Sequence, residues 1–242
     1  MNIKSMHYDF KRKLNKIDSQ QYRNLQVPEI DWILNEAISV FIDIIAKNRV
    51  PSLYKGFEHT LKNTDDIRTM VVTDHSSVFS DNGDGTYDVT LPDNYLYFEN
   101  GTAIINNLKC RDKKARIFIE EHETDFLNSP FENASYEWGE IPGVFTNTIL
   151  RLYSQNKFTI KDVFLSYIRK HDWAHNAASF KGGTYTLLDG TVLTGTRDCD
   201  LPEQTHREIV DLAVFIAAND IQTTDMQNKM NKLTLNNIVG QW

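Results

Sequence analysis

The feature that most constrains the fold is an apolar segment near the carboxyl end of this 242-residue chain, residues 209–218, in which only Asp211 is polar. Asp200 and Pro202 stand just before it, and both residue types are favoured at the start of a helix. The pattern predicts a helix over 201–218. A helix that is apolar around most of its circumference is buried on most sides. Its partner is the core of the chain, a neighbouring subunit, or both.

Further helices are predicted in the first 70 residues. Residues 6–18 place apolar groups three and four positions apart among lysines and an arginine, which indicates a short amphipathic helix with a solvated basic face. Residues 28–47 carry a broad apolar stripe. Pro28 suits the first turn of that helix, and Glu29 and Asp31 complement its positive end. A shorter helix is expected over 61–68.

The middle of the chain, 71–198, has the composition of strands. Strands are predicted at 70–72, 85–91, 115–120, 147–153 and 158–168, with a turn at 82–85. Loops are expected at 128–130 and 141–143, each of which contains a proline. Residues 182–195 indicate a small hairpin in which 187–188 and 192–193 flank Asp189 and Gly190.

These segments predict one α+β domain. Its parts are a helical region over 1–70, a β-rich region over 71–198, a buried helix over 199–218 and a polar tail over 219–242 that ends in Trp242. No linker is long enough to require two domains, so we expect a single domain.

Composition restricts the function. The formal charge of −7 argues against tight wrapping of nucleic acid, which needs a surplus of Lys and Arg. Cys110 and Cys199 are the only cysteines, and two thiols do not make a zinc site alone. The sequence has no apolar run of membrane-spanning length, and residues 1–8 lack a signal-peptide core. We therefore expect synthesis and residence in a cytoplasm.

Two histidines offer the most specific alternative to a structural role. His171 and His175 have the i, i+4 spacing with which one helix face can grip a metal, but Asp172 stands where a zincin carries Glu. A metal-dependent hydrolase with Asp172 or Glu203 as base is thus one hypothesis. A polar exit from a strand explains the same histidines, and this interpretation is preferred.

Other polar clusters have ordinary explanations. Residues 81–85 resemble a calcium loop but lack the ligands expected at its first and last positions, so a hairpin turn is preferred. The basic residues of 109–116 favour a solvated loop over a phosphate site or a contact with an acidic neighbour. His206 with Glu203 is read as a structural pair at a helix start. We find no nucleophile elbow, phosphate loop or dinucleotide motif, and expect no catalytic residue, metal or cofactor.

Four separated stretches together resemble the neck ring, or head–tail connector, family of crAss-like short-tailed phages. They are HYDF (7–10), LNKIDS (14–19) and PEIDWILNEA (28–37); GFE (56–58) and DDIRTMVV (65–72); NSPF (128–131), WGEIP (138–142) and YIRK (167–170); and CDLPEQTHREIVDLA (199–213). They cover nearly the whole chain in the family's order. Family members usually carry Pro after the third stretch, where this chain has His171.

The resemblance implies a structural virion protein, a connector-like subunit of a closed ring matched to the twelve-fold portal. The ring would join the portal to the next neck ring or the tail and extend the DNA channel, through which DNA passes without sequence-specific binding. It implies assembly in the host cytoplasm, residence in the neck of the virion and no catalytic residue. An acidic lumen would let DNA slide.

Ring closure needs two different complementary faces on each subunit. The predicted interface residues are Leu201, Ile209, Leu212, Ala213, Ile216 and Trp242. The tail 219–242 is the candidate docking arm, because Trp is an aromatic anchor common at interfaces. The rival hypothesis within the virion is a tail or capsid decoration protein that binds cells or glycans, for which Trp138 and Tyr136 would serve.

Overall fold

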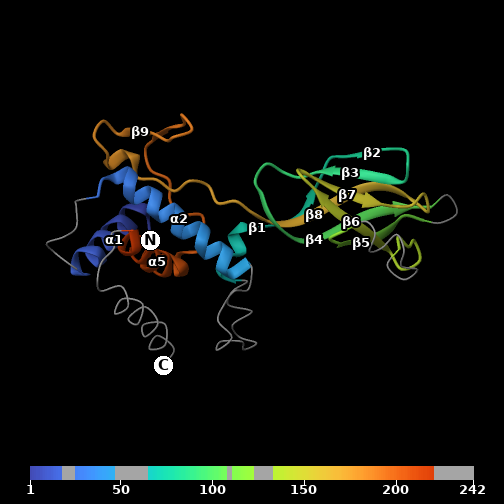
Figure 1. The fold of residues 1–242 in the computed structure, drawn as a ribbon, viewed down its shortest axis with the longest axis horizontal. Coiled ribbons are helices and arrows are strands. Elements are labelled where there is room, and N and C mark those ends of the chain that lie inside the picture. Colours follow the sequence, from blue (N-terminus) through green and yellow to red (C-terminus); the bar gives the residue numbers. More distant parts are fainter. Residues whose placement is uncertain (18–24, 47–64, 108–110, 123–132, 221–242) are drawn as a thin grey trace, which may run out of the picture. The chain divides into compact units, whose positions relative to one another are not determined.

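The chain divides into two compact units. The computed structural model describes residues 1–17, 25–46, 65–107, 111–122 and 133–220. The helical unit comprises Met1–Thr69 and His171–Trp242, and the sheet unit comprises Met70–Lys170 (Figure 1). Within the described ranges, no helix combines the length and the apolar character that crossing a bilayer requires.

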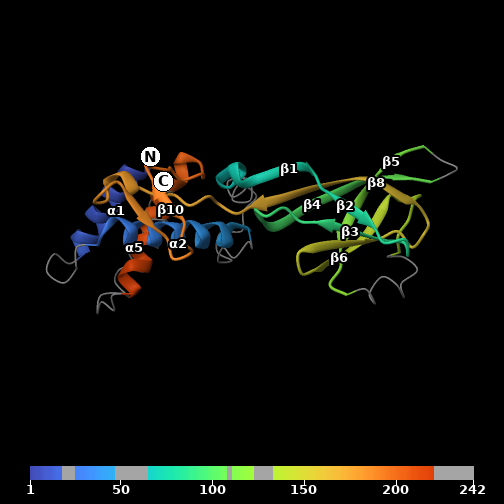
Figure 2. The same ribbon diagram turned by 90° about the horizontal axis from the view of Figure 1, so that it is seen from above.

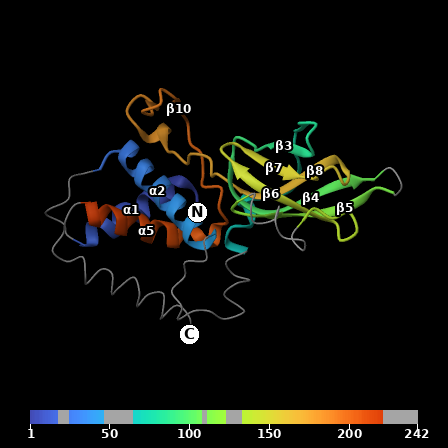
Figure 3. The same ribbon diagram turned by 45° about the vertical axis from the view of Figure 1, so that its right-hand side comes forward.

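Among the described residues, three helices form the core of the helical unit: α1 (Ile3–Ile17), α2 (Val27–Ala46) and α5 (His206–Asp220). Helix α5 packs against both α1 and α2, which come from the opposite end of the sequence (Figure 3). Each helix buries residues three and four positions apart, and those of α5 are Ile209, Val210, Ala213, Val214, Ala217 and Ala218. The sequence left open whether the partner of this apolar segment is the core of the chain, a neighbouring subunit or both. The structure shows that the chain's own helices α1 and α2 cover it.

The α5 helix begins later than predicted. Pro202 has extended backbone angles (φ −56°, ψ 144°), and a 3-10 turn, η4 (Glu203–Thr205), intervenes before His206. The backbone N–H and the hydroxyl of Thr205 both donate to the Pro202 carbonyl, at 3.0 and 2.9 Å. These two bonds satisfy groups that would otherwise be unpaired at the helix start.

The predicted hairpin is confirmed and belongs to the helical unit. Strands β9 (Thr184–Thr186) and β10 (Val192–Thr194) pair antiparallel, after a short 3-10 helix, η3 (Ala177–Ser179) (Figure 2). The first strand ends before Leu187, whose N–H donates to the Thr191 carbonyl at 2.9 Å. Gly190 has φ +88°, which favours glycine and lets the turn close.

The sheet unit is one curled sheet of eight strands in a half-barrel. Its order is β1-β8-β4-β5-β6-β7-β3-β2, and β5–β6 is its parallel pair (strands labelled in Figure 1). The strands are β1 (Val71–Ser76), β2 (Phe79–Asp81), β3 (Thr86–Thr90), β4 (Tyr95–Asn106), β5 (Lys113–Ile119), β6 (Glu140–Thr146), β7 (Ile149–Tyr153) and β8 (Thr159–Arg169). One apolar cluster, to which β3 to β8 all contribute, fills the core of the unit.

The longest strand, β4, was not predicted. Its centre contains Asn100 and Gly101, a pair that is typical of turns. In the sheet Gly101 instead permits a close approach, because a Cβ there would lie 3.1 Å from the Cβ of Ile117 on β5. Packing in the sheet therefore overrides the local turn signal.

The loop predicted at 141–143 is wrong, since these residues lie within β6. The carbonyls of Gly139 and Gly143 accept bonds from Arg116 of β5 and from Glu120 just after it, so the backbone nitrogen of Pro142 faces away from that neighbour. The antiparallel register with β7 begins one residue later, at Gly143. Proline therefore occupies a position where a missing N–H removes no ladder bond.

The boundaries also differ from the prediction. The sheet ends at Arg169, and the later strands of the predicted β-rich region 71–198, β9 and β10, belong to the hairpin of the helical unit. That the whole chain folds as a single domain stays a prediction. The 128–130 loop, the first half of the predicted 61–68 helix and the tail beyond Asp220 lie outside the described residues.

Candidate functional site

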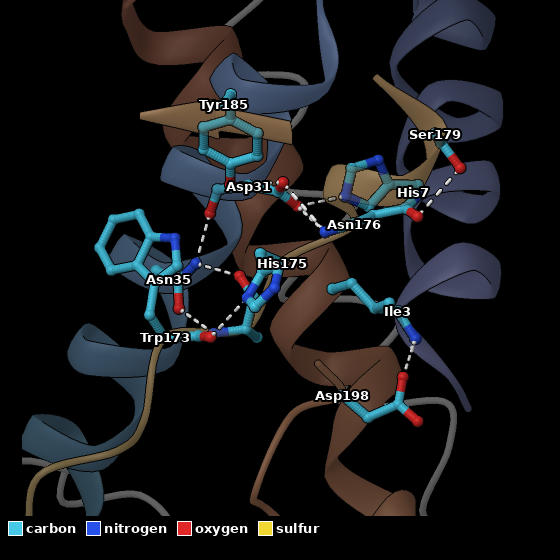
Figure 4. A network of polar contacts seen from close by, with 11 residues as sticks. Ile3, His7, Asp31, Asn35, Trp173, His175, Asn176, Ser179, Tyr185 and Asp198 are labelled. Carbon is cyan, nitrogen blue, oxygen red and sulfur yellow. Dashed lines mark hydrogen bonds and ion pairs between the residues drawn. The ribbon is translucent and has the colours of Figure 1, made fainter. Parts of the chain in front are cut away.

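A buried carboxylate organises the helical unit. Asp31 of α2 is fully buried and accepts hydrogen bonds from three other segments (Figure 4). Its oxygens lie 2.6 Å from His7 Nε2, 3.1 and 3.2 Å from the backbone nitrogen of Asn176, and 2.8 Å from the Tyr185 hydroxyl. The expectation that Asp31 serves the helix end is wrong, because its side chain enters the core.

Tyr185 is held as a donor in this cluster. Its hydroxyl is desolvated by burial and faces the Asp31 carboxylate, and both causes raise the pKa of Tyr185 above its usual range. The side chain therefore keeps its proton and the bond to Asp31 persists across the physiological range. One strand of the hairpin is thereby fastened to α2.

A second polar residue of α2 extends the network by one turn. The Asn35 side chain donates to the Ala174 carbonyl at 2.7 Å and accepts from the Ala174 N–H at 2.9 Å, as a backbone partner would (Figure 4). Asn35 also donates to the Asp31 carbonyl, 2.7 Å away. Asp31 and Asn35 thus fix residues 174–176 and the hairpin that follows.

This attachment creates an apolar groove between α2 and the hairpin. The groove has a volume of about 380 Å³ and is lined mainly by Pro28, Trp32, Ile33, Tyr185, Leu187 and Leu188. Trp32 is 48% exposed and packs edge-on against Trp173, with ring centroids 5.4 Å apart. Leu188 is 94% exposed. We call this feature the α2–hairpin groove, and it is the candidate functional site of the helical unit.

Three more large apolar side chains of the helical unit are exposed outside the groove. Val40 and Ile44 lie further along α2, and Val192 lies on β10; all three are exposed. Large exposed apolar side chains that gather on one surface are a common sign of a protein–protein contact. Sequence periodicity did not single out this surface, because the buried stripe of α2 dominates the pattern.

The predicted interface residues separate into different environments. Leu201, Ile209 and Ala213 are buried within the chain itself. Leu212 and Ile216 of α5 are half-buried, so they retain surface for a neighbour. Trp242 lies outside the described residues. The five described residues therefore do not share one exposed surface, and the role of the predicted set at an interface stays a prediction.

The two histidines of the metal hypothesis do not share a helix face. They follow β8 in irregular backbone: His171 Nε2 lies 3.0 Å from the Ser39 hydroxyl, whereas His175 Nε2 lies 3.2 Å from the Thr194 carbonyl. Asp172 forms an ion pair with Arg197. Among the described side chains, no cluster of three or more His, Cys, Asp or Glu is placed to hold a metal.

The helix start at His206 differs from the predicted pair. The ring nitrogens of His206 lie 2.7 and 2.8 Å from the carbonyls of Met1 and Leu201. Glu203 instead accepts from the amino group of Met1 at 2.7 Å, and this ammonium lowers the pKa of the Glu203 carboxyl. The arrangement fastens the beginning of α1 to the beginning of α5.

The structure also places two further polar clusters that the sequence singles out. Asp81 Oδ1 accepts from the Gly83 N–H, and Asp84 Oδ1 accepts from the Thr86 N–H, which confirms the hairpin turn at 82–85. The basic residues of 113–116 lie on strand β5 rather than in the expected loop, and Lys109 lies outside the described residues.

Neither the protein-family models nor the curated proteins include one that matches this chain.

Proposed function

We propose that this protein is a ring-forming subunit of a phage neck, which joins the portal to the tail and continues the DNA channel. Its support is the resemblance of four stretches to neck ring proteins. Two of these stretches, at opposite ends of the sequence, supply the helices α1, α2 and α5 that pack together. The residues of these two stretches thus form the packed helices of the helical unit.

The observation that carries the assembly role furthest is the exposed apolar surface around the α2–hairpin groove. The cost of leaving Trp32, Leu188 and Val192 in water is removed when another surface covers them. We assign a second copy of the chain as the occupant, because a closed ring repeats one contact between two different faces of identical subunits. A specific interface of this kind buries about 1,600 Å² in total.

In this proposal the protein works by assembly. Subunits dock beneath the portal after packaging, extend the channel and present a platform for the next ring or the tail. The formal charge of −7 suits a conduit, because DNA phosphates are repelled by an acidic wall. The half-buried Leu212 and Ile216 of α5 are the members of the predicted interface set that could contribute to a ring contact.

The test begins with the full-length protein, examined by mass photometry and negative-stain electron microscopy with and without the phage portal. We expect closed rings, with twelve-fold symmetry on the portal. Leu188→Asp should prevent ring formation without loss of fold, because the side chain is almost wholly exposed. Trp138→Ala on the sheet unit is the matched control and should form rings normally.

The outcomes separate the parts of the proposal. Monomers at every concentration, with the portal present, would contradict the ring function. Rings that persist in both Leu188→Asp and Trp32→Ala would leave the ring function standing and exclude the groove as its interface. Electron microscopy of intact virions then distinguishes a neck location from a decoration protein on the capsid or tail.

A further inference from the structure

A tryptophan of the sheet unit is held in solvent by a tightly bonded turn. Trp138 is 80% exposed and lies between Ser135 and Glu140, whose backbone groups bond to each other at 2.9 and 3.0 Å. The backbone N–H of Trp138 donates to the Ser135 hydroxyl at 3.2 Å. Gly139, at φ +69°, closes the turn. The backbone on both sides of the indole is thus fixed.

Side chains from neighbouring segments fasten the same turn to the sheet. Lys113 Nζ donates to the Glu137 carbonyl at 2.5 Å, and Lys157 Nζ donates to the Ala134 carbonyl at 2.9 Å. The Tyr136 hydroxyl donates to the Arg111 carbonyl at 2.5 Å. Such bonding is not needed to bury the indole, which remains in water. It pre-organises the turn, and pre-organisation lowers the entropic cost of binding a ligand.

The turn forms one wall of a cleft of about 790 Å³, within the size range of small-molecule sites. Aromatic, amide and charged side chains line it, among them Asn107, Lys113, Asn133, Tyr136, Trp138 and Lys157. Gln155 donates to Asn133 Oδ1 at 2.9 Å, which leaves the NH₂ group of Asn133 to donate to a ligand. The cleft therefore combines a stacking surface with hydrogen-bonding groups.

The charges of the cleft are balanced. Lys113 and Lys157 are offset by Glu137 and Glu140, which line the same cleft. Both lysines also direct hydrogen bonds into the backbone of the turn. A site for single-stranded nucleic acid needs a positively charged groove beside its aromatic residues. This cleft has the aromatic residues without the surplus of positive charge.

From these observations we propose that the cleft binds a neutral carbohydrate. The indole of Trp138 packs against the apolar face of a sugar ring, and the amide and charged groups bond to its hydroxyls. The assignment goes beyond the proposed ring function, since the ring contact is placed on the helical unit and the cleft lies within the sheet unit.

The probes are neutral trisaccharides of glucose, N-acetylglucosamine, galactose and mannose, titrated calorimetrically into the full-length protein. We expect at least one to bind with a dissociation constant on the order of a millimolar or below. Trp138→Ala should weaken this binding about tenfold, the scale of one aromatic contact. Trp32→Ala, which removes an exposed indole from the helical unit, should leave it unchanged.

Three results would overturn the proposal: no binding of any probe, equal binding by Trp138→Ala, or tighter binding of an oligothymidylate than of the sugars. An unchanged urea midpoint for Trp138→Ala verifies that the variant is folded. Ring formation by Trp138→Ala is measured separately, so failure of the carbohydrate site and failure of the ring function are distinguished.

Discussion

The hydroxyl of Tyr185 donates a 2.8 Å hydrogen bond to the buried carboxylate of Asp31, a residue 154 positions earlier in the chain. The bond joins the hairpin strand β9 to helix α2, and Tyr185 also lines the groove that we assign to subunit contact. Any change that weakens this bond is therefore expected to alter that surface as well as the stability of the helical unit.

Replacing Asp31 with Asn should destabilise the protein by about 3 kcal/mol, because a buried charge-assisted acceptor of three donors is lost. Tyr185→Phe removes one of those bonds and should cost about 1–2 kcal/mol. Urea unfolding curves measure both values. If Asp31→Asn proves as stable as the native chain, the carboxylate does not organise this unit.

Substitutions at two positions one turn apart on α5 should distinguish an effect on folding from an effect on ring assembly. Ile209→Ala should destabilise the protein by about 2–4 kcal/mol, because its side chain is fully buried against α1 and α2. Leu212→Ala should cost much less, since that side chain is half-buried. Unfolding curves give the stabilities and mass photometry gives the assembly state. Normal ring formation by Leu212→Ala would remove this residue from the proposed interface.

The sheet unit contains an ion pair that predicts an acid-dependent loss of stability. Arg151 donates to both oxygens of Asp88, at 2.7 and 3.1 Å, and holds the pKa of that carboxyl below its usual range. A lowered folded pKa stabilises the fold above the unfolded value of about 3.9, and this contribution is lost as the pH falls through the folded pKa.

The magnitude should be below about 1 kcal/mol, because both side chains are partly exposed. Urea midpoints measured between neutral pH and pH 3 should fall less steeply for Asp88→Asn than for the native chain. Asp93→Asn, at an exposed position of the same unit, should follow the native curve. Parallel curves for the native chain and Asp88→Asn would contradict the prediction.

Cys199 should resist alkylation in the folded protein. Burial raises the pKa of its thiol to about 11, so very little thiolate exists at neutral pH. In a Cys110→Ser background, iodoacetamide at pH 8 should react about 100-fold or more slowly with the folded chain than with the urea-unfolded chain. Mass spectrometry follows the reaction. Equal rates would show that the thiol is accessible in the folded state.

The sheet unit should fold without the helical unit, a result that would replace the single domain predicted from the sequence with two. Its first and last strands pair with Val71 opposite Ile168, so the two ends of the excised segment lie side by side. A fragment of residues 70–170 should show a cooperative thermal transition and the circular dichroism of a β-protein. The reciprocal chain, with a short Gly-Ser linker in place of this segment, should retain its helical signal. Loss of structure in both would show that the two units fold only together.

Much of the helical core could be predicted from sequence, because apolar residues three and four positions apart report directly on a buried face. The same periodicity could not assign that face to a partner, and α5 proved to be covered by α1 and α2. Asp31 and Asn35 were the signal that was missed. They lie in step with buried Leu34 and Ile38, so two polar residues on an apolar stripe already indicated a buried network.

The sheet was predictable only in part, because local signals conflicted with long-range pairing. Asn100 and Gly101 are typical of a turn, as Pro142 and Gly143 are of a loop, yet both pairs lie within strands. The α2–hairpin groove had no local signal at all. It exists because residues near Trp32 meet residues near Leu188, and only the tertiary structure brings these segments together.

The helical unit is built from both ends of the sequence, and this has a consequence for biosynthesis. A ribosome releases α1 and α2 first, then the sheet segment, and α5 last. The apolar faces of the first two helices therefore stay uncovered by α5 while the roughly 160 residues between Ala46 and His206 are synthesised. Nascent chains of this protein would depend on chaperones during that interval, and an unfinished chain would lack the helix that completes the unit.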